Sequence, residues 1–314
     1  MDGSAGPGLG RRTTLAARVP FVGVGLHSGR RIRGALGPAA SGAGIVFLRT
    51  DLGLTIPALY DRVVETRLCT VLGEGPARVA TVEHLLAALS ASGVDDALIE
   101  LDGPEVPIFD GSAEPFQFLI DCAGLRRQPG LPRSIEVLRP IRVQEGEGPE
   151  AAWAELRPAL TDGLDASLTI SFTARAIGEQ TYRLRVTPES FRAELARART
   201  FTLAEDVARL QAAGLGLGGG LHNAVVVDDA RVLNPGGLRF ADEFVRHKLL
   251  DVVGDLALAG APLHARFSAQ RSGHALNNRL LRALFADPTA WRFVPGHALV
   301  DGATMPLAAV AAPA

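Results

Sequence analysis

The sequence predicts an α+β protein, because segments with strand character are grouped ahead of segments with helical character in each half of the chain. Its composition fits this class, since 47% of the 314 residues are hydrophobic and can fill one large core or two smaller ones. A segment rich in Gly, Pro and Arg at 124–134 is typical of a linker. We therefore expect a first domain over 1–127, a second over 128–295 and a flexible tail over 296–314.

Charge and composition argue against several functional classes. The formal net charge is −2 without a long basic run, so we expect no nucleic-acid partner. The N-terminal residues lack an apolar segment, and no apolar run approaches the roughly 20 residues that span a bilayer. These features predict a cytoplasmic protein with no integral membrane segment. The two cysteines, Cys69 and Cys122, are too few for a disulfide framework and are expected to be free and buried.

In the first half, strand-like segments precede a helical pattern over 81–89. Thr81 is a candidate N-cap for this helix, and Gly93 is a candidate for the left-handed residue that follows its end. The sequence then predicts a strand over 95–103 and a helix over 112–122.

The second half repeats this order. Strand-like alternation is found near 135–143, 166–173 and 181–186. Helices are then expected over 189–197 and 204–213, followed by a Gly-rich run and an apolar strand over 224–227. A long helix should begin near Asp242 and end at Gly260, where Gly and a nearby Pro are stop signals. A strand over 263–270 and a helix over 272–285 complete the prediction.

The long helix carries a polar stripe on an otherwise broad apolar surface. Its residues His247 and Asp251 are four positions apart, so their side chains leave the same face. Such a pair alone is more often part of a solvated surface. A helix this apolar is largely buried, however, and its polar residues must then be paired or bind a ligand. Imidazole and carboxylate are both good zinc ligands.

The helix over 81–89 offers the groups that such a zinc site would lack. Catalytic zinc usually has three protein ligands, and His84 would supply the third. Glu83 would place a carboxylate beside the metal, where a general base is needed. His274, expected at the start of the last helix, is by itself more often a cap or core residue. Paired with Asp255 it would be a cationic general acid, because a nearby carboxylate raises a histidine pKa.

Two glycine-containing segments have weaker signals. The run over 214–223 contains a G-x-G-x-x-G match that ends at Gly219, but a helix is expected before it and a strand after it. That order rules out a dinucleotide fingerprint and leaves a loop that shapes a ligand channel. The segment 23–29, GVGLHSG, predicts a tight turn that exposes Leu26 and His27.

Six segments occur together in one order: GVGLHSG, TVEHLLAAL, DGPEVPIFDGSA, RTF, VRHKLLDVVGDLALAG and SGHALNN. With them the chain resembles, over about 12–290, the UDP-3-O-acyl-N-acetylglucosamine deacetylases, the zinc amidases of lipid A biosynthesis in Gram-negative bacteria. The resemblance implies two two-layer sandwich domains, each with a sheet packed on helices and with the active site between them. It also implies hydrolysis of the acetamide of UDP-3-O-(3-hydroxyacyl)-N-acetylglucosamine to the free amine and acetate, the committed step of that pathway.

The resemblance also implies roles for individual residues. The implied metal ligands are His84, His247 and Asp251. The implied catalytic groups are the general base Glu83, the general acid or oxyanion partner His274, its orienting carboxylate Asp255, and Thr200, which polarises the scissile carbonyl. The implied substrate contacts are Leu26, His27, Phe201, Gly219 and Lys248. Of these, Lys248 would face the diphosphate, and Leu26 and the loop containing Gly219 would border the acyl passage.

Gly220 and His222 depart from the family pattern, which usually has Ser and an acidic residue there. This departure bears on the acyl passage and leaves open a zinc amidase for another N-acetylated substrate. A third hypothesis is a non-enzymatic binding module with a structural zinc, against which the near-neutral charge and scarce aromatics weigh. One catalytic Zn²⁺ is expected, with Fe²⁺ as a cellular alternative. We expect a monomer whose partner is a small UDP-sugar with an acyl chain.

Overall fold

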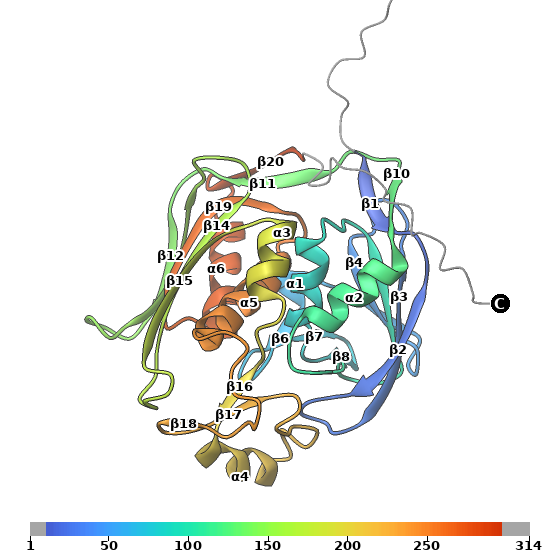
Figure 1. The fold of residues 1–314 in the computed structure, drawn as a ribbon. Coiled ribbons are helices and arrows are strands. Elements are labelled where there is room, and N and C mark those ends of the chain that lie inside the picture. Colours follow the sequence, from blue (N-terminus) through green and yellow to red (C-terminus); the bar gives the residue numbers. More distant parts are fainter. Residues whose placement is uncertain (1–10, 297–314) are drawn as a thin grey trace, which may run out of the picture.

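The computed structural model describes residues 11–296 and contains helices and strands in four layers (Figure 1). A large sheet lies on each outer side, and two layers of helices face each other between them. The predicted α+β class is therefore confirmed. The division into two sandwich domains at residue 127 stays a prediction. Within the described range, no helix combines the length and apolar character needed to cross a bilayer.

One outer layer is a five-stranded sheet from the first half of the chain. Its strands, in spatial order, are β2 (Val19–Val24), β3 (Arg31–Pro38), β9 (Ala97–Leu101), β4 (Ile45–Arg49) and β5 (Leu54–Pro57). Only the β4–β9 pair is parallel. Helices α1 (Glu83–Ala91) and α2 (Glu114–Ala123) lie on its inner side. A short 3₁₀ turn (Tyr60–Arg62) leads into a small sheet formed by β6 (Val63–Glu65), β7 (Val71–Glu74) and β8 (Ala77–Val79).

The other outer layer is a seven-stranded sheet from the second half. Its main path is β12 (Ile141–Glu145), β13 (Ala152–Pro158), β19 (Leu263–Gln270), β11 (Arg133–Val137) and β20 (Trp291–Pro295). Strand β14 (Leu164–Ser171) also pairs with β19, in parallel, and with β15 (Glu179–Val186). Helices α5 (Glu243–Ala257) and α6 (His274–Ala286) cover the inner face.

Smaller elements complete the fold. They are β1 (Arg12–Leu15) paired with β10 (Leu125–Gln128), α3 (Pro188–Ser190) with a π-helical turn (Phe191–Leu195), α4 (Ala204–Ala212), and a sheet of β16 (Phe201–Leu203), β17 (Val225–Asp228) and β18 (Arg231–Val232). The Gly-rich segment 214–223, which contains Gly219, lies between helix α4 and strand β17. The helix-then-strand order that argued against a dinucleotide site is therefore confirmed.

Several sequence predictions of local structure are wrong. Thr81 does not cap α1: its φ is +58°, and its hydroxyl donates to the buried carboxylate of Glu105 instead. The segment 124–134 is not irregular throughout, because it contains β10, which pairs with β1; that it links two domains stays a prediction. Cys122 is free but exposed, whereas Cys69 is free and buried as predicted. The expected helix over 189–197 is only a short α3 and a π-helical turn.

Strand β13 was missed altogether. Its sequence, AWAELRP, is rich in residues with low strand propensity, and it forms a strand because β12 and β19 pair with its two edges. The confirmed predictions include Gly93, which has φ +68° after the end of α1, and β19, whose bounds match the expectation. The predicted tail over 296–314 lies almost entirely outside the described residues.

The two inner helical layers meet where α5 crosses the start of α1. A Cβ atom on Gly254 of α5 would lie only 2.7 Å from the carbonyl carbon of Glu83, so the two backbones are in direct contact there. Glycine in a helix interior costs about 1 kcal/mol relative to alanine. The close approach explains why glycine occupies this position, and it brings the first turn of α1 onto the polar stripe of α5.

Gly254→Ala should therefore destabilise the protein by about 1–3 kcal/mol despite the better helix propensity of alanine, because the added methyl group forces the helices apart. Chemical denaturation would measure the loss. Gly236→Ala is the matched control, since a Cβ atom there meets no atom within 4 Å. Equal stability of the two variants would show that the helices can separate at no cost.

Candidate active site

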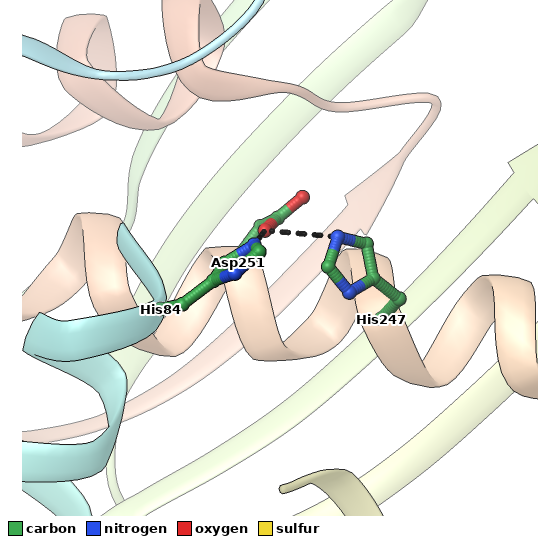
Figure 2. Close-up of side chains that lie close together, drawn as sticks. All are labelled: His84, His247 and Asp251. Carbon is green, nitrogen blue, oxygen red and sulfur yellow. Dashed lines mark ion pairs between the residues drawn. The ribbon is translucent and has the colours of Figure 1, made fainter. Parts of the chain in front are cut away.

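Helices α1 and α5 bring three candidate metal ligands together (Figure 2). His84 comes from the first turn of α1, and His247 and Asp251 come from consecutive turns of α5. The Nε2 atoms of both histidines lie 3.5 Å from Oδ1 of Asp251, and one ligand atom from each residue lies within 4.8 Å of the others. All three side chains are buried. The spacing leaves room for one ion between three converging lone pairs.

The protonation states of His247 and Asp251 are those that metal ligands need. Nδ1 of His247 lies 3.0 Å from the carbonyl oxygen of Ala198, which can only accept, so Nδ1 carries the proton and Nε2 presents its lone pair. Burial lowers the pKa of His247 to about 4, against the charge of Asp251, which keeps this ring neutral near pH 7. Burial opposes ionisation of Asp251, but the charge of Lys248 holds the pKa of its carboxyl well below the usual range.

Asp251 also shows that the site fits a cation. Its Oδ2 accepts a hydrogen bond from Nζ of Lys248 at 2.9 Å, while its Oδ1 is buried without any hydrogen-bond partner. A buried carboxylate oxygen without a partner is costly, and a divalent ion between it and the two imidazoles would remove that cost. Among the described residues, this is the one group of three or more His, Cys, Asp or Glu side chains with metal-binding spacing.

Glu83 lies beside the candidate metal ligands. It precedes His84, its side chain is buried, and its Oε2 accepts a hydrogen bond from the backbone N–H of Thr70 at 3.1 Å. Burial raises the pKa of Glu83 above its usual value, and the nearby charge of His274 opposes that rise. A carboxylate with a raised pKa is better matched to accept a proton near neutral pH.

His274 opens α6, directly after the loop that follows β19, as the sequence predicted. Its Nδ1 lies 2.8 Å from Oδ2 of Asp255, and its Nε2 lies 3.8 Å from Oε1 of Glu83. Burial would lower the pKa of His274, but the charges of Asp255 and Glu83 outweigh it and raise the pKa to about 9. The ring is therefore an imidazolium at neutral pH, available as a proton donor.

These groups share a cavity of about 220 Å³. Its walls include the predicted Leu26, His27, Glu83, His84, Thr200, Phe201, His247, Lys248, Asp251 and His274. Two predicted residues do not line it: Asp255 lies behind His274, and Gly219 lies against Leu26, where an added Cβ atom would be 3.3 Å from the leucine side chain. The predicted turn over 23–29 is present, but Leu26 and His27 are half-buried rather than exposed.

The sequence reasoning missed several residues at this site. They are the cavity-lining Leu68, Cys69, Thr81, Ile108 and Phe172, together with Thr70 and Asn277, which donate hydrogen bonds to the carboxylates of Glu83 and Asp255. Burial raises the pKa of Cys69 above its usual range, so its thiol is not a nucleophile here. All of the missed residues except Asn277, which lies in α6, come from loops or strand ends, where no periodic pattern marks them.

The segment carrying Thr200 and Phe201 is held from both sides. The backbone N–H of Thr200 donates to the carbonyl oxygen of Gly111, and its carbonyl oxygen accepts from Val225. Next to it, the guanidinium of Arg199 donates to both carboxylate oxygens of the fully buried Glu243, at 2.8 and 3.0 Å. Glu243 begins α5, so this ion pair ties the segment to the helix that carries two candidate metal ligands.

The Gly-rich loop reaches the same region. The N–H of Gly218 donates to the carbonyl oxygen of Leu26 at 3.0 Å, so the loop lies along the GVGLHSG turn. Both ring nitrogens of the half-buried His27 are buried without a hydrogen-bond partner, and burial lowers the pKa of this imidazole. The proximity of Leu26 to this loop agrees with the expectation; its role toward an acyl chain stays a prediction.

Two histidines and one carboxylate around an open position, with a carboxylate and an imidazolium beside them, are typical of mononuclear metal-dependent hydrolases. Comparison with known proteins is more specific. Residues 12–286 match the family model LpxC, UDP-3-O-acyl N-acetylglycosamine deacetylase. The chain belongs to this family, which confirms the predicted family and its deacetylase activity.

Relatives named UDP-3-O-acyl-N-acetylglucosamine deacetylase agree with this result. One from Anaeromyxobacter dehalogenans is 48% identical over 281 residues, covering 90% of this chain and 89% of the relative. One from Acidithiobacillus ferrooxidans is 47% identical, covering 90% and 93%. One from Myxococcus xanthus is 46% identical, covering 93% and 91%. The similarity therefore extends over nearly the whole of each chain.

Replacing any candidate ligand, as in His84→Ala, His247→Ala or Asp251→Ala, should abolish stoichiometric binding of a divalent metal, because two remaining ligands cannot hold it. Metal analysis after dialysis measures the effect. Asp255→Asn is the control, since this buried carboxylate faces His274 and should leave the metal content unchanged. Full metal content in all three alanine variants would place the metal elsewhere.

Proposed function

We propose that the chain hydrolyses the acetamide of UDP-3-O-acyl-N-acetylglucosamine with one zinc ion held by His84, His247 and Asp251. The observation that carries the proposal is the shared cavity, in which a neutral imidazole, an ionised carboxylate with an unpartnered oxygen, a carboxylate of raised pKa and an imidazolium converge. When bound there, zinc would supply Lewis acidity, lowering the pKa of water and polarising the amide carbonyl.

Glu83 is the proposed general base. Its raised pKa suits it to take a proton from the attacking water, and its Oε1 lies 3.8 Å from Nε2 of His274. His274, protonated near neutral pH, is the proposed donor to the departing glucosamine nitrogen and a cationic partner for the developing oxyanion. Asp255 fixes the ring through Nδ1, which leaves Nε2 free to face the reacting atoms.

The remaining cavity walls are proposed substrate contacts. Thr200 would polarise the scissile carbonyl, and its backbone is fixed by bonds to Gly111 and Val225. Lys248 is already paired with Asp251, whose charge raises the Lys248 pKa against the effect of burial, so this ammonium stays charged and can face the diphosphate.

Phe201 and His27 would contact the sugar nucleotide. Leu26 and the loop at Gly219 would border the acyl chain. That border is supported by the hydrogen bond from Gly218 to Leu26 and by the 54% and 46% exposure of Leu217 and Leu221 in the loop.

We further propose that the chain acts in the cytoplasm as a monomer. The proposed architecture is two sandwich domains divided near residue 127, with the active site between them. The placement of α1 and α5, one from each half, at the centre of the layers supports this division. Fe²⁺ is an alternative metal for the same ligands.

The purified protein should release acetate from UDP-3-O-(3-hydroxyacyl)-N-acetylglucosamine, lose this activity on chelation and regain it with zinc. The control substrate is UDP-N-acetylglucosamine without the acyl chain, which should react much more slowly if the acyl chain is bound. Equal rates on both would favour an amidase for another N-acetylated substrate. A metal-loaded protein that releases no acetate would contradict the proposal.

Glu83→Gln should keep the metal and lose most turnover, by about 10²–10⁴-fold, because the amide cannot accept the proton from water. Metal analysis and acetate release on the same preparation separate the two effects. Asp121→Asn is a surface control, since Asp121 pairs with Arg192 away from the cavity. A Glu83→Gln variant that turns over like the parent protein would remove Glu83 from the mechanism.

The rate should show a bell-shaped pH dependence. It rises as Glu83 loses its proton, above the usual carboxyl range because that pKa is raised, and it falls as His274 loses its proton near pH 9. Asp255→Asn removes the charge that most raises the His274 pKa, so the basic limb should move to lower pH. A basic limb that stays in place in this variant would assign it to another group.

A further inference from the structure

Thr70 forms hydrogen bonds with both Glu83 and Asp255, although it does not line the cavity. It lies in the loop between β6 and β7 and is only 1% exposed. Its backbone N–H donates to Oε2 of Glu83 at 3.1 Å. Its hydroxyl donates to Oδ1 of Asp255, 185 residues away, at 2.6 Å. One residue therefore binds the proposed base and the carboxylate that orients the proposed acid.

The hydroxyl bond completes the set of donors around Asp255. Oδ2 of this carboxylate accepts from Asn277 at 2.8 Å and pairs with Nδ1 of His274 at 2.8 Å. Oδ1 is bound by Thr70. Asn277 binds the oxygen that His274 already uses, so it cannot replace the bond to Oδ1. Among the hydrogen bonds of the described residues, that from Thr70 is the one to Oδ1, and it therefore restricts rotation of the Asp255 carboxylate about its Cβ–Cγ bond.

Rotation of the Asp255 carboxylate would move the His274 ring, and the distances that join Asp255, His274 and Glu83 are short. Nε2 of His274 lies 3.8 Å from Oε1 of Glu83 while its Nδ1 is paired with Asp255, so the position of Asp255 sets the position of the ring. A loss of alignment by less than an ångström at this point is enough to slow a proton transfer. The backbone bond of Thr70 to Oε2 fixes the other partner, leaving Oε1 of Glu83 directed toward His274.

We propose that Thr70 is a positioning residue for catalysis, which holds the carboxylates of Glu83 and Asp255 so that base and acid act on the same bond. This inference rests on the proposed function of the cavity. Substitution can remove only the hydrogen bond from the Thr70 hydroxyl to Asp255, because the backbone N–H that binds Glu83 is present in every variant. Threonine and valine have nearly the same shape, so the hydroxyl can be removed with little change in volume.

Thr70→Val should lower kcat by about 10- to 100-fold, as expected for a lost hydrogen bond to a charged group, with KM little changed. Thr70→Ser restores the hydroxyl and should recover most of kcat. The matched control is Thr14→Val, because Thr14 is equally buried and its hydroxyl donates at 2.7 Å to the backbone oxygen of Asp96, remote from the cavity. This control should lose stability without losing kcat.

A double-mutant cycle tests whether Thr70 acts through Asp255. In an Asp255→Asn background, Thr70→Val should have little further effect on kcat. The same fold-loss in both backgrounds would overturn the proposal, as would a kcat for Thr70→Val equal to that of the parent protein or a failure of Thr70→Ser to recover activity. If Thr70→Val does not fold, Thr70→Ala removes the hydroxyl without adding a methyl group and carries the same expectations.

A readout independent of turnover separates this inference from the proposed function. The proton on Nδ1 of His274 is held by Asp255 and should give a downfield NMR signal. Thr70→Val should shift or broaden that signal, and Thr70→Ser should keep it. An unchanged signal in Thr70→Val overturns the positioning role whether or not the protein releases acetate. Absence of acetate release from the parent protein would overturn the proposed function alone.

Discussion

The backbone contact between α1 and α5 at Gly254 is the constraint on which the site depends. Because no side chain separates the helices there, the first turn of α1 lies directly on the polar stripe of α5. His84 can then reach Asp251 at the same 3.5 Å as His247, although the two histidines are far apart in the sequence. Any larger residue at this crossing would widen the gap between ligands from the two helices. The four-layer arrangement serves to keep this pair of helices buried between two sheets (Figure 1).

Burial at the α1–α5 crossing also strengthens the interactions between the charged groups of the site and so shifts their pKa values. Glu83, Asp251 and Asp255 lie with Lys248 and His274 in a region of low dielectric, where interactions between charges are strong. Their pKa values move apart as a result: that of Asp251 is lowered, that of Glu83 is raised and that of His274 rises to about 9. Neighbouring groups of similar chemistry thereby differ in protonation, as the proposed roles of ligand, base and acid require. The differences arise from each group's partners rather than from its residue type.

Hydrogen bonds from loops hold these groups in place. Ala198 fixes the tautomer of His247, and the buried Arg199–Glu243 pair ties the segment of Thr200 to the start of α5. Thr70, from the loop between β6 and β7, donates hydrogen bonds to the carboxylates of Glu83 and Asp255. These partners are on irregular segments supported by the sheets, so the precision of the site depends on tertiary packing as well as on the two helices.

The sequence by itself determined the α+β class, most of the helices and many of the strands, and it predicted which residues form the site. Helical periodicity placed His247 and Asp251 on one face, and specific motifs identified Glu83, His84 and His274 together with the family. Only the tertiary structure decided that these residues meet, because the α1–α5 contact joins segments more than 150 residues apart in the sequence. It also decided the contacts of Thr70 and Asn277 and the formation of β13 and β10. The local sequences of β13, β10 and the Thr70 loop have weak propensity or no periodic signal, and Asn277 lies in a predicted helix whose partners lie elsewhere in the chain; all of these acquire their contacts from the strands and side chains that pack against them.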